Sequence, residues 1–206
     1  MATLPMFPLE SVLLPGMVLP LQVFEERYQA LVHDCLEGDK QFGVVLIERG
    51  SEVGGGDVRA TVGTQAEIVK AEQVPDGRWA VVAVGTTRIR VTQWLPDDPY
   101  PRAEVEDWPD EIAPDAAALT ATYTSLVADT RRILALAAEL GDGGNPLADF
   151  TDQADLGSYQ LALMAPIGPL DRQRLLSAAG PAQRLDRLAS MLAEEEQVLQ
   201  ARLNGG

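Results

Sequence analysis

The chain has 206 residues, with 31 acidic and 16 basic side chains and a formal net charge of -15. A charge of this sign and size repels phosphate backbones and anionic lipid headgroups, so we expect neither nucleic acid nor a membrane among its partners. The length suffices to bury a sizeable core, and the single cysteine, Cys35, excludes an intramolecular disulfide.

The apolar stretch from Val12 to Tyr28 is the place where a leader peptide or an anchor could lie. No lysine or arginine precedes it, Glu10 interrupts the apolar run, and Pro15 and Pro20 break the helix that a signal peptide forms. The stretch is also shorter than the roughly 20 apolar residues that a membrane span requires. We therefore expect a cytoplasmic protein.

The first elements are short and extended. Residues 4–9 and 12–16 contain prolines, which restrict them to strand ends or sheet edges. Apolar side chains then repeat with a helical period up to Gly38, which ends the run. On that helix we expect Phe24 and Tyr28 to pack against the neighbouring sheet.

Further strands are predicted up to about residue 110. A glycine-rich loop, residues 51–59, follows the first of them, and Pro75-Asp76-Gly77 favours a tight hairpin turn between the next two. The strand-sized runs are residues 42–49, 64–74, 78–85, 87–95 and 102–108. Short strands around one early helix indicate a small, partly closed β-barrel.

The remainder of the chain is predicted to be helical. Asp115 supplies a capping signal for a helix that ends at Gly141, and Asp152 or Asp155 could cap the next helix. Asp171 could cap a short third helix, and Pro181 suits the first turn of the last one. We expect a bundle of about four helices.

The residues that carry catalysis are scarce. His33 and Cys35 lie two apart on the predicted helix, so their side chains face different sides and cannot easily share a metal or a reaction. The lysines, Lys40 and Lys70, have no serine-lysine context, and the glycine-rich loop lacks the Gly-Lys-Ser/Thr ending of a phosphate-binding loop. We therefore predict no catalytic residue, no cofactor and no metal site.

The opening residues carry a resemblance to a known family. Leu4 to Leu9, Val12 to Gly16, Leu19 to Leu21 and Val23 to Tyr28 match, in order, motifs at the start of the substrate-binding domain of the Lon proteases. Later runs of the strand region and the Arg-Leu-x-Arg-Leu pattern at Arg184 to Leu188 continue the match, so that it covers nearly the whole chain. Leu14, Glu26 and Ile89 depart from the usual Phe, Pro and Phe.

The resemblance implies a stand-alone Lon-type amino-terminal domain of the α+β class: a β-rich PUA-like pseudo-barrel with one early helix, residues 1–112, followed by a helical bundle, residues 113–206. The ATPase and protease domains of Lon are absent from the sequence, so neither activity is carried over. The family-motif residues, for which we expect structural roles, are Pro15, Gly16, Phe24, Glu25, Arg27, Tyr28, Gly43, Gly63, Asp76, Gly77 and Arg88.

Two functions are compatible with these observations. The first is a non-catalytic module that binds unfolded or degradation-bound polypeptides, as an adaptor or regulator of a separate ATP-dependent protease, through a sheet edge or an apolar groove. Trp94, Tyr100 and Trp108 are the candidate peptide contacts, because large amphipathic rings often anchor interfaces and these three adjoin proline-rich turns. The second is a small hydrolase or ligand-binding enzyme with an unrecognised site, which would require a pocket holding a titratable group of shifted pKa.

Overall fold

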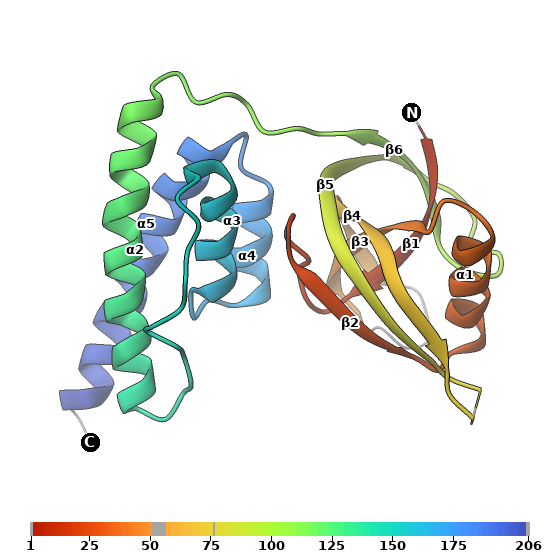
Figure 1. Cartoon of the computed structure of the whole chain (residues 1–206), viewed down its shortest axis with the longest axis horizontal. Coiled ribbons are helices and arrows are strands. Elements are labelled where there is room, and N and C mark those ends of the chain that lie inside the picture. The colour runs from red at the N-terminus through yellow and green to blue at the C-terminus, as the bar shows by residue number, and fades with distance from the viewer. Residues whose placement is uncertain (1, 51–56, 76, 205–206) are drawn as a thin grey trace. The chain divides into compact units, whose positions relative to one another are not determined.

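The computed structural model of the chain describes residues 2–50, 57–75 and 77–204. The chain divides into two compact units, residues 1–109 and 110–206. The first contains strands and one helix, and the second is helical (Figure 1). The predicted α+β class and the order of its two parts are confirmed. In the described part of the chain, no helix combines the length and the apolar composition that crossing a bilayer demands.

The strands of the first unit form one curved sheet with the order β2-β5-β4-β3-β1-β6. The long strand β5 pairs with β2 through its first residues, 79–84, and with β6 through its last, 89–94. That second pairing closes the sheet into the predicted pseudo-barrel. The strands are β1 (Ala2–Leu9), β2 (Val18–Val23), β3 (Gln41–Arg49), β4 (Val58–Gln73), β5 (Trp79–Trp94) and β6 (Arg102–Asp107).

Strand β1 lies inside the sheet, although its prolines predicted a strand end or an edge. Residues 2–5 pair with β6, and residues 6–9 pair with β3 on the other side. Each half of β1 is thus paired along one side. Pro5 and Pro8 therefore each have one side along which no strand pairs and no N–H donor is needed. Proline is usually confined to edge strands because only there is its missing N–H tolerated.

Strand β5 joins two runs, 78–85 and 87–95, that the sequence presents as separate. The interruption of the apolar pattern at Gly85 marks a close contact with the preceding loop: Gly85 donates to the carbonyl of Met17 and accepts from the N–H of Gly16, each at 2.8 Å. The hairpin between β4 and β5 is confirmed, with Gln73 opposite Trp79. Asp76 of its turn lies outside the described residues, as do residues 51–56 of the predicted glycine-rich loop.

Helix α1 (Glu26–Glu37) packs its apolar face on the sheet through Tyr28, Leu31, Val32 and Cys35. The ring of Tyr28 stacks on that of Phe7 of β1, with 4.3 Å between centroids. The expected packing of Phe24 is wrong. The helix begins two residues after Phe24, so this residue is not on the helical face, and its side chain is 58% exposed.

Two glycines of the family motif allow strands and side chains to approach closely. A Cβ added to Gly63 of β4 would lie 2.2 Å from the backbone carbonyl oxygen of Val44, and one added to Gly43 of β3 would lie 2.5 Å from the Sδ of buried Met6. Both distances are shorter than any van der Waals contact. The expected structural role of these two glycines thus has a steric cause.

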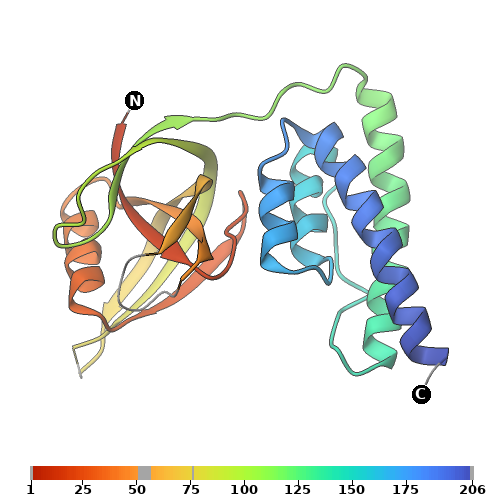
Figure 2. The same cartoon turned by 180° about the vertical axis from the view of Figure 1, so that it is seen from behind.

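The second unit is a helical bundle. The long helices α2 and α5 run side by side, and the short helices α3 and α4 pack against one side of this pair (Figures 1 and 2). The bounds are α2 (Ala116–Glu139), α3 (Ala154–Met164), α4 (Pro169–Leu176) and α5 (Pro181–Asn204).

The helix starts of this unit agree with the sequence in part. The carboxylate of Asp115 accepts the N–H of Ala118 and caps α2, and Pro181 opens α5, both as predicted. The caps predicted at Asp152 or Asp155 and at Asp171 are wrong. The N-cap residue is Gln153 in α3 and Gly168 in α4, and neither forms a side-chain capping bond. In α4 the helix begins at Pro169, ahead of Asp171.

A fully buried arginine joins the start of this unit to its core. The guanidinium of Arg184 on α5 donates to Asp110 at 2.6 and 3.2 Å, to the hydroxyl of Ser158 at 2.7 Å and to the carbonyl of Leu175 at 3.2 Å. It also lies 3.6 Å from the ring centroid of Tyr159. A buried charge is tolerated only with such partners. The bonds to Arg184 therefore fix the position of Asp110 against the bundle.

Candidate functional site: the open side of strand β2

Strand β2 is the one end of the sheet order that the closing pairs leave open. It pairs with β5 in the described part of the structure, and no described strand lies along its other side (Figure 1). An edge of this kind presents backbone N–H and C=O groups to which a further strand can pair. The backbone groups along this side of β2 can therefore pair with a further strand.

The alternation of bonds along the pair tells which backbone groups point outward. The N–H of Gly85 on β5 donates to the carbonyl of Met17, the residue just before β2. The backbone carbonyl of Met17 therefore points toward β5. Every second residue from there has the same orientation, so Val18, Pro20 and Gln22 direct their backbone groups to the open side. Pro20 has no N–H to offer, which leaves the N–H groups of Val18 and Gln22 and three carbonyls.

Two hollows adjoin this strand, and Pro20, Leu21 and Gln22 line both of them. The larger, about 400 Å³, is bounded further by residues of β4 and β5: Lys70, Glu72, Ala80, Val81 and Val82. The smaller, about 180 Å³, is bounded further by Phe7, Leu9, Val23, Phe24, Glu25 and Tyr28. A peptide paired to β2 could therefore place side chains into hollows on the two faces of the edge.

The side chains along β2 add apolar surface to this backbone. Val18 is 64% exposed, and Phe24, just beyond the strand, is more than half exposed as well. Leu19 and Leu21 are half-buried against the core on the inner face. Exposed apolar side chains at both ends of one open edge are an arrangement that monomeric proteins avoid unless a partner covers it.

The end of the smaller hollow has a defined electrostatic character. The Arg27 side chain bonds the carboxylate of Glu25 at 3.0 Å and lies 4.5 Å from the ring centroid of Tyr28. Burial raises the pKa of the Tyr28 hydroxyl to about 12, so this wall is a neutral phenol at physiological pH. The Glu25–Arg27 pair is compensated internally. Apolar contact therefore dominates at this end of the edge.

The structure does not bring the three predicted peptide contacts together. Tyr100 is 6% exposed, and its hydroxyl donates to Asp34 at 2.5 Å, so its ring belongs to the core and is not available to a peptide. Its neighbouring proline turn suggested exposure, but the ring folds inward. The predicted interface role of Tyr100 is thus at odds with its burial.

Trp94 and Trp108 are half-buried and lie near opposite ends of the β5–β6 pair. The Arg59 guanidinium lies 4.8 Å from the Trp94 ring centroid, and Arg88 and Arg90 each lie 4.3 Å from that of Trp108. These contacts give both rings a packing role within the unit. Contact of Trp94 or Trp108 with a peptide stays a prediction.

The other motif residues have structural positions. Pro15 is buried, Gly16 has φ +80° where the loop turns toward β5, and Gly77 has φ +88° in the β4–β5 turn. Arg88 is buried beneath Trp108. The sequence predicted a sheet edge or an apolar groove as the binding surface but did not place that edge on β2. The one relevant signal there was Pro20 within an apolar run.

The residues considered for catalysis point to different sides of α1, as their spacing predicted. His33 is exposed beside Asp34 and Glu37, whose ligand atoms lie within 4.8 Å of one another. Cys35 is buried, its thiol donates to the carbonyl of Gln41 at 3.3 Å, and burial raises the pKa of the thiol to about 12. Cys35 is therefore protonated near neutral pH and a poor nucleophile.

Comparison with known proteins identifies the family. The model of the ATP-dependent protease La (LON) substrate-binding domain matches residues 3–194. The chain belongs to the LON substrate-binding domain family. This LON domain is 31% identical to a Lon N-terminal domain protein from Xanthomonas campestris, whose crystal structure aligns with a TM-score of 0.66 over 92% of this chain and 98% of that one.

Two relatives show how large a share of a longer protein the LON domain makes up. Lon protease 2 of Herpetosiphon aurantiacus is 30% identical over 203 residues, which cover 96% of this chain and 24% of that protein. The Lon protease of Koribacter versatilis is 29% identical over 205 residues, 97% of this chain and 25% of that protein. The LON domain thus spans about a quarter of the length of these curated relatives.

The fold is shared more widely than the sequence. The N-terminal domain of a Lon protease from the Mycobacterium avium complex is 18% identical and aligns with a TM-score of 0.61 over 93% of this chain.

Proposed function

We propose that this LON domain binds unfolded or flexible polypeptides in an extended conformation, as a strand added to the open side of β2, and that it performs no catalysis. The observation that carries the proposal is the open backbone of β2 between two hollows that share Pro20, Leu21 and Gln22. Main-chain bonds give affinity for any extended segment, while hollows on alternate faces select its side chains.

The family supports this function and suggests a partner. The domain model is described as substrate-binding, and the longer relatives are named Lon proteases. A polypeptide held on β2 would therefore be delivered to an ATP-dependent protease, with this chain as an adaptor or regulator. The buried, protonated Cys35 and the exposed His33, which lies on another side of α1, support a role in binding rather than in bond cleavage.

Strand addition can be tested with two peptides that differ in their backbone alone. One is a fluorescein-labelled, unstructured peptide rich in valine and leucine, and the other has an N-methyl group at every residue. N-methylation at every residue removes the N–H donors along both edges of the extended peptide and leaves every side chain in place. We expect the first peptide to raise fluorescence anisotropy on titration with the protein and the second to bind much more weakly. Equal binding of the two would exclude strand addition.

Substitutions on β2 locate the site. Gln22→Pro removes an outward N–H without touching the bonds to β5, and loss of one backbone bond should weaken binding roughly 2- to 13-fold. Val18→Ser should weaken it through lost apolar contact. Val58→Ser is the matched control, because Val58 is also an exposed strand valine of the same unit. Weakening by the control as large as that by Val18→Ser would contradict the assignment to β2.

A further inference from the structure

The second unit has a groove that results from the unequal lengths of two helices. Helix α4 has 8 residues and α5 has 24, so at 1.5 Å per residue they are about 12 and 36 Å long. Helix α4 can therefore cover only part of α5 along the side where they pack. Residues 166–168, which precede α4, together with Asp171 and Arg174 on α4 and the facing side of α5, bound a groove of about 690 Å³.

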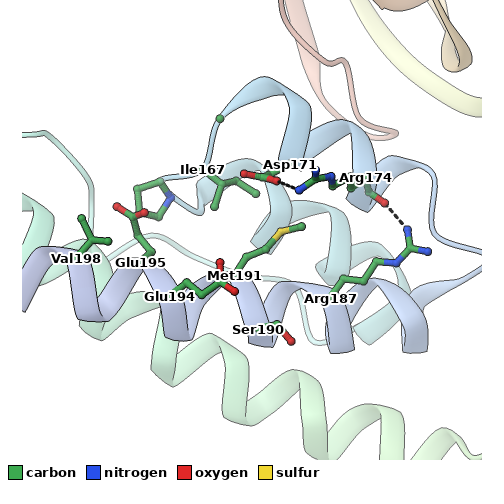
Figure 3. A pocket seen from close by; sticks show the side chains of 11 residues that line it. Ile167, Asp171, Arg174, Arg187, Ser190, Met191, Glu194, Glu195 and Val198 are labelled. Carbon is green, nitrogen blue, oxygen red and sulfur yellow. Dashed lines mark hydrogen bonds and ion pairs between the residues drawn. The ribbon is translucent and has the colours of Figure 1, made fainter. Parts of the chain in front are cut away.

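The groove has an apolar floor between two charged ends. Ile167 from the α3–α4 connection and Met191 and Val198 from α5 form the floor (Figure 3). Val198 is 52% exposed, and the other two are half-buried. On α5, the lining residues recur at helical spacing in a stripe separate from Leu188, Leu192 and Leu199, which are buried in the bundle.

The basic end of the groove is largely satisfied from within the protein. Arg174 bonds Asp171 at 2.7 Å, and Arg187 donates to the backbone carbonyl of Arg174 at 2.6 Å (Figure 3). The same contacts hold both guanidinium groups at α4. An incoming anion would have to compete with Asp171 for Arg174.

The acidic end differs. Glu194 and Glu195 lie about two helical turns further along α5 and line the groove. Within the described part of the chain, neither carboxylate forms an ion pair or a hydrogen bond, whereas the next residue, Glu196, is paired with Arg132. The groove therefore presents two adjacent carboxylates beside apolar surface. Neither is bonded in the described structure, and Glu195 exerts only a longer-range attraction on Arg202.

We infer that this groove is a second polypeptide-binding site, which takes a segment with a lysine or arginine beside bulky apolar residues. The cation would lie beside the carboxylate of Glu194 or of Glu195, and the apolar side chains would cover Ile167, Met191 and Val198. The net charge of -15 adds long-range attraction for a basic segment and repulsion for an acidic one. This site goes beyond strand addition at β2 and does not depend on it.

The test uses the full chain and two fluorescein-labelled amphipathic peptides. One is built from lysine, leucine and alanine, and its counterpart has glutamate at every lysine position. The double variant Glu194→Gln/Glu195→Gln removes the two negative charges of the proposed site. The control, Glu139→Gln/Asp186→Asn, neutralises two other acids of the helical unit and so changes the net charge equally. Anisotropy is measured at low and at physiological salt.

We expect the lysine peptide to bind and the glutamate peptide not to bind. The double variant should bind the lysine peptide roughly 2- to 30-fold more weakly than the wild type, as expected for the loss of two exposed ion pairs. The control variant should lose much less affinity. Val198→Ser should also weaken it, whereas Gln22→Pro on β2 should not, which separates this site from the edge.

Three outcomes would overturn the inference. The first is equal affinity of the double variant and the wild type for the lysine peptide, and the second is equal weakening by the control variant. The third is sedimentation showing a dimer that the peptide does not dissociate and that the double variant abolishes, because the occupant would then be a second copy of this chain.

Discussion

Replacing Arg184 with alanine should destabilise the helical unit selectively. The substitution removes every partner that the guanidinium supplies to Asp110, Ser158 and the carbonyl of Leu175. Breaking a buried ion pair from one side typically costs 3–5 kcal/mol. Because the Asp110 side chain is 22% exposed and can regain water, we expect the lower end, about 3 kcal/mol.

The distribution of tryptophan allows the two units to be followed in one sample. All three, Trp79, Trp94 and Trp108, lie in the first unit, so their fluorescence reports the barrel, while far-UV circular dichroism reports mainly the helical unit. With a urea slope of about 1–3 kcal/mol/M, a loss of 3 kcal/mol lowers the dichroism midpoint by roughly 1–3 M. The fluorescence midpoint should stay in place.

Two further variants separate the effect of the buried Arg184 cluster from that of an exposed ion pair. Arg184→Lys keeps the charge but not the forked donors, so it should fall between wild type and alanine. Arg132→Ala breaks the exposed pairs with Glu196 and Asp129 and should cost less than about 1 kcal/mol. If Arg184→Ala shifted the dichroism midpoint no more than Arg132→Ala, the assignment of this cluster as the centre of the bundle would be wrong.

Two other predictions concern the barrel. Gly63→Ala forces a Cβ against a backbone carbonyl and should lower the free energy of unfolding by about 1–3 kcal/mol, whereas Gly38→Ala, whose Cβ would be 3.4 Å from its nearest neighbour, should change it far less; urea titrations followed by tryptophan fluorescence compare them. The barrel should also lose stability between about pH 9 and 12. Burial raises the pKa of Cys35 from 9.0 to about 12, and that of Tyr28 from 10.0 to about 12.

The sign of the pH effect follows from proton binding. Both groups hold their protons more tightly in the folded state, so the unfolded state loses protons first as the pH rises. The stabilisation is complete below the unfolded pKa values and disappears as the pH approaches the folded ones. Cys35→Ala should therefore flatten the decline of the urea midpoint with pH. An equally steep decline in that variant, or equal costs of the two glycine substitutions, would contradict these predictions.

Local patterns predicted the parts of the fold that depend on near neighbours. The helical period identified the buried face of α1 from Tyr28 to Cys35, and the turn residues identified the β4–β5 hairpin. Phe24 fits the same period but precedes the helix start, so periodicity alone placed it on a face that the backbone does not continue. Element boundaries depend on capping, which is weaker in sequence than periodicity.

The candidate site was beyond such patterns because it depends on pairing between distant strands. Strand β2 is open along one side because β5 pairs with β6 and closes the sheet without it. The residues Val18–Val23 alone do not indicate this. The contact of both Arg88 and Arg90 with the Trp108 ring likewise follows from the register of β5 and β6. Arg184 did carry a signal, since it occupies the apolar stripe of α5 beside Leu188.

The pairing of β1 has a consequence for synthesis on the ribosome. Residues 6–9 can pair as soon as β3 has emerged, but Ala2 pairs with Val105, roughly one hundred residues later. At about 5–20 residues per second, the interval between β3 and β6 lasts several seconds. Throughout it, the first half of β1 lacks its partner, and the apolar Leu4 remains accessible. The barrel can close, and cover Leu4, only after β6 has left the ribosome.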